Sequence, residues 1–187
     1  MFDDGRRDDL RARLLARHGA ARLSSLHLTR SERRTVARML SEKVLTSHPD
    51  HVVALPSAEA LVITCRRLGG VMTCGHALKH YGIPLREPPG ILHVAIPAQR
   101  SRVPNAIGRT VVHRVRGLLI PKDTKPPVAE VEQALICYMR CADELDALIS
   151  LDAALRIGYT TRSQLASALQ GPRNRPLRSL LVQAQPT

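Results

Sequence analysis

Two cysteines and two histidines within a short stretch of the sequence have the chemistry of metal ligands: Cys65, Cys74, His76 and His80. Thiolates and imidazoles are the ligands that zinc prefers, and a helix over "HALKH" would place both histidines on one face. The spacing of the four residues is not that of a known zinc motif. A zinc protease also needs a glutamate directly after the first histidine, where this chain has Ala77. We therefore predict no metal site and interpret the two histidines as structural or surface residues.

The remaining patterns give no support for catalysis. The sequence contains no Walker loop, dinucleotide-binding fingerprint, nucleophile elbow or paired-carboxylate site. Cys74 and His76 are the residue types of a nucleophile and its base. We do not expect them to act as such a pair, because residues two apart on a helix do not face each other. Cys137 and Cys141 lie one turn apart in an apolar helical stretch, and we expect both in the core. The sequence thus predicts a protein that is not an enzyme and needs no cofactor.

The charge of the chain suggests an acidic partner. There are 28 Lys and Arg residues against 16 Asp and Glu residues, which gives a net charge of +12. Such an excess favours nucleic acid, then an acidic protein, then an anionic membrane surface. With one Phe, three Tyr and no Trp, the chain lacks the aromatic platforms on which single-stranded nucleic acids stack. Double-stranded DNA is therefore the expected partner.

Further features predict a cytoplasmic protein. The start "MFDDGRRDDL" is acidic and has no apolar signal-peptide core, and no later segment approaches the length of a membrane-spanning helix. The four cysteines contain no CxxC pair and follow no secreted-type framework, so we expect them to be reduced. We expect no membrane partner.

The stretch "RSERRTVARMLSEK", residues 30–43, predicts a helix with two different faces. At about 100° per residue, Val36, Met39 and Leu40 gather on one side. Arg34 and Arg38 point away from that side, at roughly 160° and 200° from Val36. The helix should therefore bury an apolar stripe and present arginines to solvent.

The elements around this helix predict a winged helix-turn-helix over residues 1–55. An earlier helix carries Leu10, Leu14 and Leu15 at helical spacing, and a short second helix can be capped by Ser24 or Ser25. After the third helix, "VLTSHPDHVVALP" reads as a β-hairpin around a Pro-Asp turn. The alternatives are a helical hairpin with a basic surface and a degenerate winged helix that binds protein.

In a winged helix, the third helix lies in the major groove and its exposed side chains meet the bases. Arginine can bind the O6 and N7 atoms of guanine together. We expect Arg34 and Arg38 to contact bases, with Ser41 beside them. Expected contacts to the DNA backbone come from Arg30, Arg33, Lys43 and His48.

A second domain is predicted over residues 57–170, with a boundary near Pro56. It should contain a helix in "PSAEALVITCRRLGG", another in "VMTCGHALKHYGIP", strands in "ILHVAIP" and "RTVVHRVRG", and helices in the last third. Residues 171–187 are basic and interrupted by prolines, so we expect a flexible tail. The predicted fold class is α+β, with a winged helix-turn-helix followed by a mixed α/β domain with a small sheet and C-terminal helices.

The middle of the chain forms a second candidate contact surface. No acidic residue occurs between Glu87 and Asp123, whereas basic residues are frequent: Arg100, Arg102, Arg109, Arg114, Arg116 and Lys122. Arg100, Arg102, Arg114 and Arg116 are our candidates for contacts to DNA. The same charges would also suit an acidic protein partner or simply protect a solvated sheet edge.

Several phrases together resemble the actinobacterial members of the AbiEi family of toxin-antitoxin regulators. These are "GGVMTCGHALKHYGIP", "LHVAIP", "VVHRVRG" and "LDAALRIGYTTRSQLASAL", in this order after the N-terminal segment. The resemblance implies an antitoxin that represses its own promoter through the winged helix and counters a nucleotidyltransferase-like toxin through the following domain. The expected type is the one without the endonuclease domain that some relatives carry. The alternative is a stand-alone repressor of phage or prophage type without a toxin partner.

Overall fold

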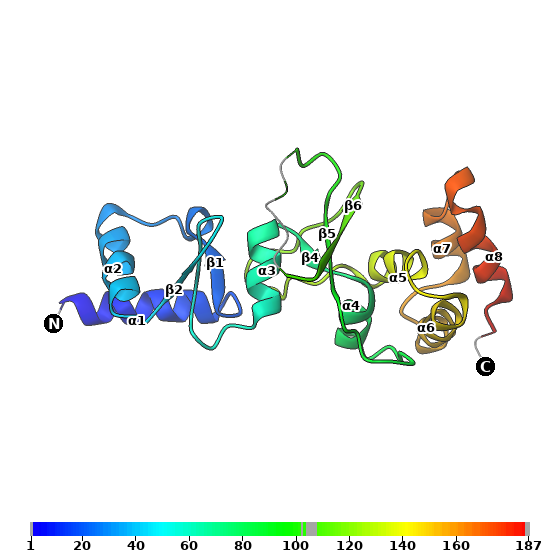
Figure 1. The fold of residues 1–187 in the computed structure, drawn as a ribbon, viewed down its shortest axis with the longest axis horizontal. Coiled ribbons are helices and arrows are strands. Elements are labelled where there is room, and N and C mark those ends of the chain that lie inside the picture. The colour runs from blue at the N-terminus through cyan, green and yellow to red at the C-terminus, as the bar shows by residue number, and fades with distance from the viewer. Residues whose placement is uncertain (1, 102, 104–107, 186–187) are drawn as a thin grey trace. The chain divides into compact units, whose positions relative to one another are not determined.

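The computed structural model describes residues 2–101, 103 and 108–185, and it divides the chain into two compact units. The first unit contains residues 1–71, with the returning segments 99–108 and 120–127. The second unit contains residues 72–98, 109–119 and 128–187. Figure 1 shows the elements of both. The α+β class is confirmed, since each unit combines helices with a small sheet.

The first unit begins with four helical and three strand segments whose order agrees with the expected order for its helices and hairpin. They are α1 (Phe2–Leu15), β1 (Ala20–Arg22), the 3-10 helix η1 (Leu23–Leu26), α2 (Arg30–Ser41), β2 (Thr46–His48), β3 (Val52–Ala54) and α3 (Ala60–Leu68). The strands pair antiparallel in the order β1-β3-β2, so that β2 and β3 form the predicted hairpin. The predicted second helix is only the short η1. Assignment of these elements as a winged helix stays a prediction.

The core of the first unit lies between α1, α2 and the sheet. Leu10, Leu14, Val36 and Met39 are buried there, as the helical spacing predicted. Leu15 was expected beside them but is exposed. Successive residues of a helix are rotated by about 100° about its axis. The side chain of Leu15 therefore points away from the core that Leu14 faces.

The first unit extends beyond the predicted boundary at Pro56. Val62 of α3 packs with Ala20, Val52 and Ala54 of the sheet. The Arg22 side chain of β1 also donates to the backbone oxygen of Arg66, at 2.7 Å from Nε. We therefore place the division between the units at residue 71 and assign α3 to the first unit.

The second unit is built on a small sheet in the order β4-β5-β6. Its elements are β4 (Val71–Met72), α4 (Cys74–His80), β5 (Leu92–Pro97), β6 (Thr110–Val115), α5 (Val131–Met139), α6 (Glu144–Ile157), α7 (Arg162–Ala168), the 3-10 helix η2 (Pro172–Asn174) and α8 (Arg175–Gln183). The two predicted strands are confirmed as β5 and β6. They run parallel, with His93 opposite Val111 and Ala95 opposite His113.

The C-terminal segment is a packed helix, so the expectation of a flexible tail over residues 171–187 is wrong as far as residue 185. Leu177, Leu180 and Leu181 of α8 are buried, and the helix contacts α6 and α7. The side chain of Arg162 donates to the backbone oxygen of Leu181 at 2.8 Å. Pro176 does not prevent the helix because it lies in the first turn, where backbone N–H groups lack helical partners.

No helix in the described part of the chain is both long and apolar enough to cross a membrane.

Candidate functional site

Helix α2 begins at a well-formed cap. Thr29 Oγ1 accepts a hydrogen bond from the backbone N–H of Glu32 at 3.3 Å, and the backbone N–H of Thr29 donates to Glu32 Oε2 at 2.6 Å. The hydrogen bonds from Thr29 lower the pKa of Glu32 to about 2. Glu32 also lies 2.6 Å from the guanidinium of Arg13. The carboxylate of Glu32 is therefore bonded at the start of the helix and does not neutralise the basic outer face.

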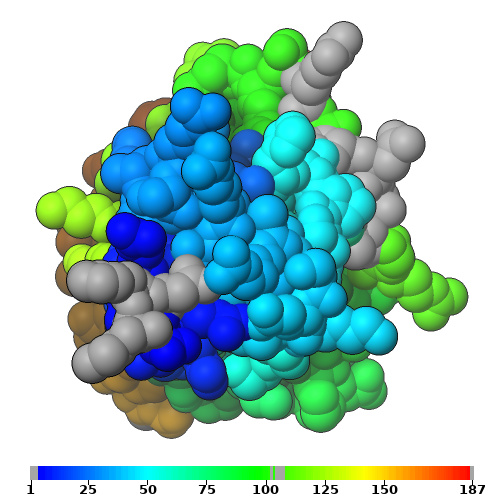
Figure 2. Space-filling view, turned by 90° about the vertical axis from the view of Figure 1, so that its left-hand side faces the viewer, coloured from blue at the N-terminus to red at the C-terminus, as the bar shows by residue number. Residues whose placement is uncertain are grey.

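The arginine face of α2 comprises Arg30, Arg34 and Arg38. All three side chains are exposed, whereas Val36 and Met39 on the opposite side are buried. This confirms the predicted orientation of the helix. In the space-filling view, the light-blue and cyan segments that contain α2 and the hairpin form much of the surface that faces the viewer (Figure 2). Within the described part of the chain, Arg30 and Arg34 make no hydrogen bond or ion pair, so their donors are available to a ligand.

The other residues predicted for the DNA contact lie in different settings. Ser41 is exposed and donates to the backbone oxygen of Arg38 at 2.8 Å, and Lys43 is exposed just after the helix. His48 is half-buried on β2, where its Nε2 lies 3.0 Å from Thr46 Oγ1. Arg33 instead donates to the backbone oxygen of Leu28 at 3.2 Å. It borders a largely apolar pocket between η1, α2 and the hairpin.

The basic residues in the middle of the chain are distributed over both units. Arg100 belongs to the first unit, where it is half-buried and its guanidinium lies 3.4 Å from the backbone oxygen of Gly69. Burial, followed by the charge of Arg22, lowers the pKa of Arg100. Arg114 and Arg116 belong to the second unit, and Arg102 lies outside the described residues. The candidate residues thus belong to two units, and their joint role in a DNA contact stays a prediction.

Arg114 and Arg116 line a pocket of the second unit together with Arg140 and Arg173. The side chain of Arg140 donates to Asn174 Oδ1 at 2.9 Å. None of the described residues that line this pocket is acidic. The pocket, which we call the arginine pocket, is suited to an anionic group.

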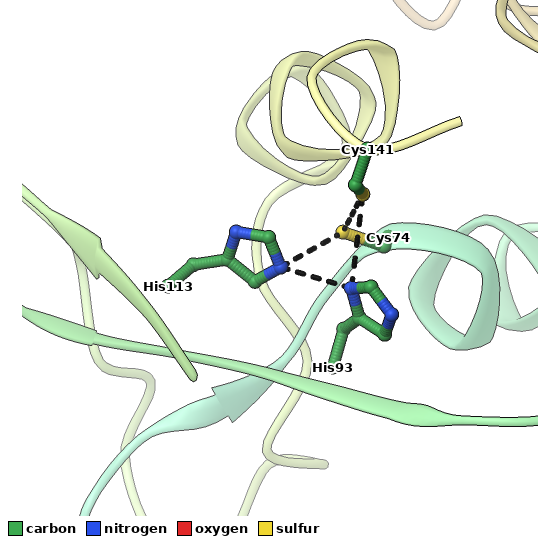
Figure 3. Close-up of side chains that lie close together, drawn as sticks. All are labelled: Cys74, His93, His113 and Cys141. Atoms are coloured by element: carbon green, nitrogen blue, oxygen red, sulfur yellow. Dashed lines mark hydrogen bonds between the residues drawn. The ribbon is translucent and has the colours of Figure 1, made fainter. Parts of the chain in front are cut away.

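Four potential metal ligands converge elsewhere in the second unit: Cys74, His93, His113 and Cys141. Cys74 is the first residue of α4, His93 and His113 lie on β5 and β6, and Cys141 lies in the turn after α5. Figure 3 shows the two sulfur atoms and the two rings pointing toward one another. We call this group the cysteine-histidine cluster.

The distances within the cluster are those of atoms that could share one ion. Cys74 Sγ lies 3.4 Å from Cys141 Sγ and 3.5 Å from His113 Nε2. His93 Nδ1 lies 2.9 Å from His113 Nε2 and 3.7 Å from Cys141 Sγ. All four ligand atoms lie within 4.8 Å of one another. In a tetrahedral zinc site, ligand atoms are roughly 3.3–3.8 Å apart, given the usual Zn–N and Zn–S bond lengths.

The thiols of the cluster have opposite pKa shifts. The hydrogen bond from Cys74 lowers the pKa of Cys141 to about 3, against the effect of burial and with further hydrogen bonds from His113 and His93. The same hydrogen bond, together with burial, raises the pKa of Cys74. The surroundings therefore stabilise one thiolate, and a bound cation would be needed to stabilise the second.

The structure does not assemble the four ligands considered from the sequence. Cys65 is buried on α3 in the first unit, His80 is exposed and His76 is half-buried on α4, where burial lowers its pKa. Only Cys74 belongs to the cluster. Cys137 is buried as expected, but Cys141 is exposed, because α5 ends at Met139 and leaves Cys141 in the following turn.

His93, His113 and Cys141 were missed as a site because they are distant in sequence and follow no motif. One feature of the sequence could have indicated part of it. Both predicted strands carry a histidine, and in the parallel pair His93 and Ala95 lie opposite Val111 and His113. Since side chains alternate along a strand, this register places both histidines on the same face of the sheet.

Comparisons with known proteins give no relative for the chain: no protein-family model matches it, and no curated protein is significantly similar in sequence. The resemblance to AbiEi regulators therefore stays a prediction.

Proposed function

We propose that the protein is a transcriptional regulator that binds specific sequences of duplex DNA through α2. The observation that carries this proposal is the arginine face of α2. The face is exposed, and the helix that bears it is fixed by the capping box at Thr29 and by the buried Val36 and Met39. A basic face on a firmly anchored helix can hold its side chains in register with DNA.

The dimensions of α2 suit the major groove. Its 12 residues span about 18 Å, and the groove, about 12 Å wide, admits an α-helix. Arg34 and Arg38 are one turn apart, a rise of about 6 Å that corresponds to roughly two base-pair steps. Each guanidinium carries donors that match the O6 and N7 atoms of one guanine.

The elements around α2 support the same function. A helix, a strand, a short helical turn, a second helix and a hairpin follow one another, which is the order expected of a winged helix with an extra strand. The β2–β3 hairpin follows directly after Lys43 and carries His48. In the proposed complex, Lys43 and His48 contact the DNA backbone, and Ser41 lies near the bases.

The finer role that we propose is that of an AbiEi-like antitoxin. The arginine pocket supports a second contact in the second unit, because it would receive an acidic side chain of a partner protein. A nucleotidyltransferase-like toxin is the partner that the sequence resemblance implies. A stand-alone repressor remains the alternative, and it would use α2 in the same way without needing the arginine pocket.

A selection from random duplexes tests the DNA-binding function. The full chain should enrich a defined operator, and the Arg34→Ala variant should enrich it weakly or not at all. Arg11→Ala is the matched control, since Arg11 is an exposed arginine on α1 and its loss removes the same charge. If wild-type protein enriches no sequence, or if both variants lose selection equally, the proposal is wrong.

Co-expression tests the antitoxin role separately. A nucleotidyltransferase-like toxin should co-purify with the wild-type chain and be lost from an Arg116→Ala/Arg173→Ala variant that still binds the operator. The outcome that contradicts this role is an operator-binding protein that neither retains nor neutralises such a toxin.

A further inference from the structure

We propose that the cysteine-histidine cluster binds one zinc ion. Cys74, His93, His113 and Cys141 supply two sulfur and two nitrogen atoms, and the four pairs with stated distances lie between 2.9 and 3.7 Å apart. Three of these distances fall within the roughly 3.3–3.8 Å expected between ligands of a tetrahedral zinc ion, and the distance between the two histidines is shorter, so the rings would move apart slightly on binding. The cluster belongs to the second unit, so the inference does not depend on how α2 binds DNA.

The ligand types select the class of metal. Calcium and magnesium require oxygen ligands, and no carboxylate belongs to the cluster among the described residues. Two thiolates with two imidazoles form a common structural zinc site, with tetrahedral geometry. Zinc is therefore the ion that the donor set favours.

The number of ligands indicates a structural rather than a catalytic ion. Catalytic zinc sites have three protein ligands and keep the fourth position for water or substrate. Here four side chains fill the tetrahedron, which leaves no position for a water molecule. The ion would hold protein segments together without performing chemistry.

The segments that the ion would join are distant in sequence. Cys74 and Cys141 are separated by 67 residues, and the two histidines lie on the two long strands of the sheet. Zinc would thus tie the start of α4 and the turn after α5 to β5 and β6. Such a link matters in a sheet with only three strands, of which β4 has two residues.

The backbone at Cys74 has a conformation that brings its side chain to the other three ligands. Its φ angle is +52°, in the left-handed region that side-chain-bearing residues adopt at a conformational cost. This conformation occurs where the chain leaves β4 and enters α4, and it places the sulfur atom in the cluster (Figure 3).

Metal analysis of the full chain, purified under reducing conditions, tests the inference. We expect one zinc ion per chain in the wild type and almost none in Cys141→Ser, a conservative change at an exposed position. His80→Ala is the matched control, because His80 is an exposed histidine on α4 outside the cluster, and it should retain the full amount of zinc.

A cobalt titration keeps the inference testable if Cys141→Ser fails to fold. After zinc is removed, Co²⁺ should give the thiolate-to-cobalt absorption and the visible bands of a tetrahedral complex in wild type and in His80→Ala. Wild-type protein that holds no zinc and shows neither absorption would overturn the inference. A Cys74–Cys141 disulfide that persists under reducing conditions, or full zinc retention by folded Cys141→Ser, would also overturn it.

Discussion

The arginine face of α2 and the cysteine-histidine cluster use their side chains in opposite ways. The arginines lie on one helix, and their side chains are exposed to solvent. The cluster draws its four residues from four segments and requires their atoms to meet within 4.8 Å. An exposed basic surface attracts a negatively charged partner from a distance. A metal site, in contrast, binds its ion only when all ligand atoms lie at bonding distance.

This difference has consequences for how each region responds to its surroundings. Dissolved salt screens exposed charges over about 10 Å at 0.1 M, so DNA binding by the arginine face should weaken steeply with salt. Metal-ligand bonds in a half-buried cluster should be insensitive to salt and sensitive to chelators. The two regions can therefore be disturbed separately.

Removal of zinc should have the largest effect of the changes considered, on the stability of the second unit. A strong chelator should destabilise the second unit by several kcal/mol, below the roughly 10–16 kcal/mol of apparent zinc-binding energy measured in small peptides. Amide hydrogen exchange should accelerate in β5 and β6 and stay unchanged in α2. Uniform acceleration in both units would contradict the assignment of the ion to the second unit, and unchanged exchange in both would contradict a structural role.

Loss of an arginine from α2 should have the second-largest effect, in this case on the affinity for DNA. Arg34→Ala and Arg38→Ala should each weaken binding to the selected operator by about 1–3 kcal/mol, as expected for a lost contact to guanine. Binding to a scrambled duplex should change much less. Fluorescence anisotropy with both duplexes measures the difference, and an equal loss on both would show that the helix acts only as a basic surface.

Removal of the cap at the start of α2 should have a moderate effect. Thr29→Ala should lower the free energy of unfolding of the first unit by about 1 kcal/mol, because the backbone N–H of Glu32 loses its acceptor. Thr29→Ser keeps the hydroxyl and is the control. Urea unfolding followed by circular dichroism measures both, and equal stability of the two variants would argue against the cap.

The cap also predicts a dependence on pH. The pKa of Glu32 is lowered from 4.5 to about 2 in the folded chain, so its stabilising effect is complete above pH 4.5 and is lost as the pH falls toward 2. Glu32→Gln should remove this part of the acid sensitivity of the first unit. Unfolding between pH 2 and 6 is the measurement, and identical pH profiles for variant and wild type would contradict the hydrogen-bond assignment.

Substitutions in the arginine pocket should have the smallest effect on DNA. If Arg114 and Arg116 contact only phosphates, each alanine variant should weaken all duplexes alike and reduce the slope of log K against log salt by about one unit. If they instead receive an acidic protein, the slope should not change. Salt titrations of Arg114→Ala and Arg116→Ala measure the slope: the proposed contact with a protein partner predicts no change, and a reduced slope would contradict it.

Features set by neighbouring residues were predictable from the sequence. The two faces of α2, the β2–β3 hairpin and the strands β5 and β6 all follow from local patterns of polarity and turn residues. These patterns act within a few residues of each element. For the same reason, the arginine face could be located before the structure was known.

Features set by tertiary packing were not predictable in this way. The sequence around α8 predicted a flexible tail. The helix is instead stabilised by contacts with α6 and α7, which the local sequence does not show. The boundary at Pro56 was misplaced because α3 packs on a sheet formed by residues far before it. The cysteine-histidine cluster depends on the register of β5 with β6 and on the end of α5, which no local pattern encodes.

A base-analogue cycle tests the central claim, contact between α2 and guanine, most directly. Within the selected operator, single guanines are replaced by 7-deazaguanine, which lacks the N7 acceptor, and affinity is measured for wild type and Arg34→Ala. The account predicts one guanine whose replacement weakens wild-type binding by about 1 kcal/mol or more and leaves Arg34→Ala unaffected, since each change removes the same bond. If every replacement affects both proteins equally, and the same holds for Arg38→Ala, the arginines of α2 do not read guanine N7.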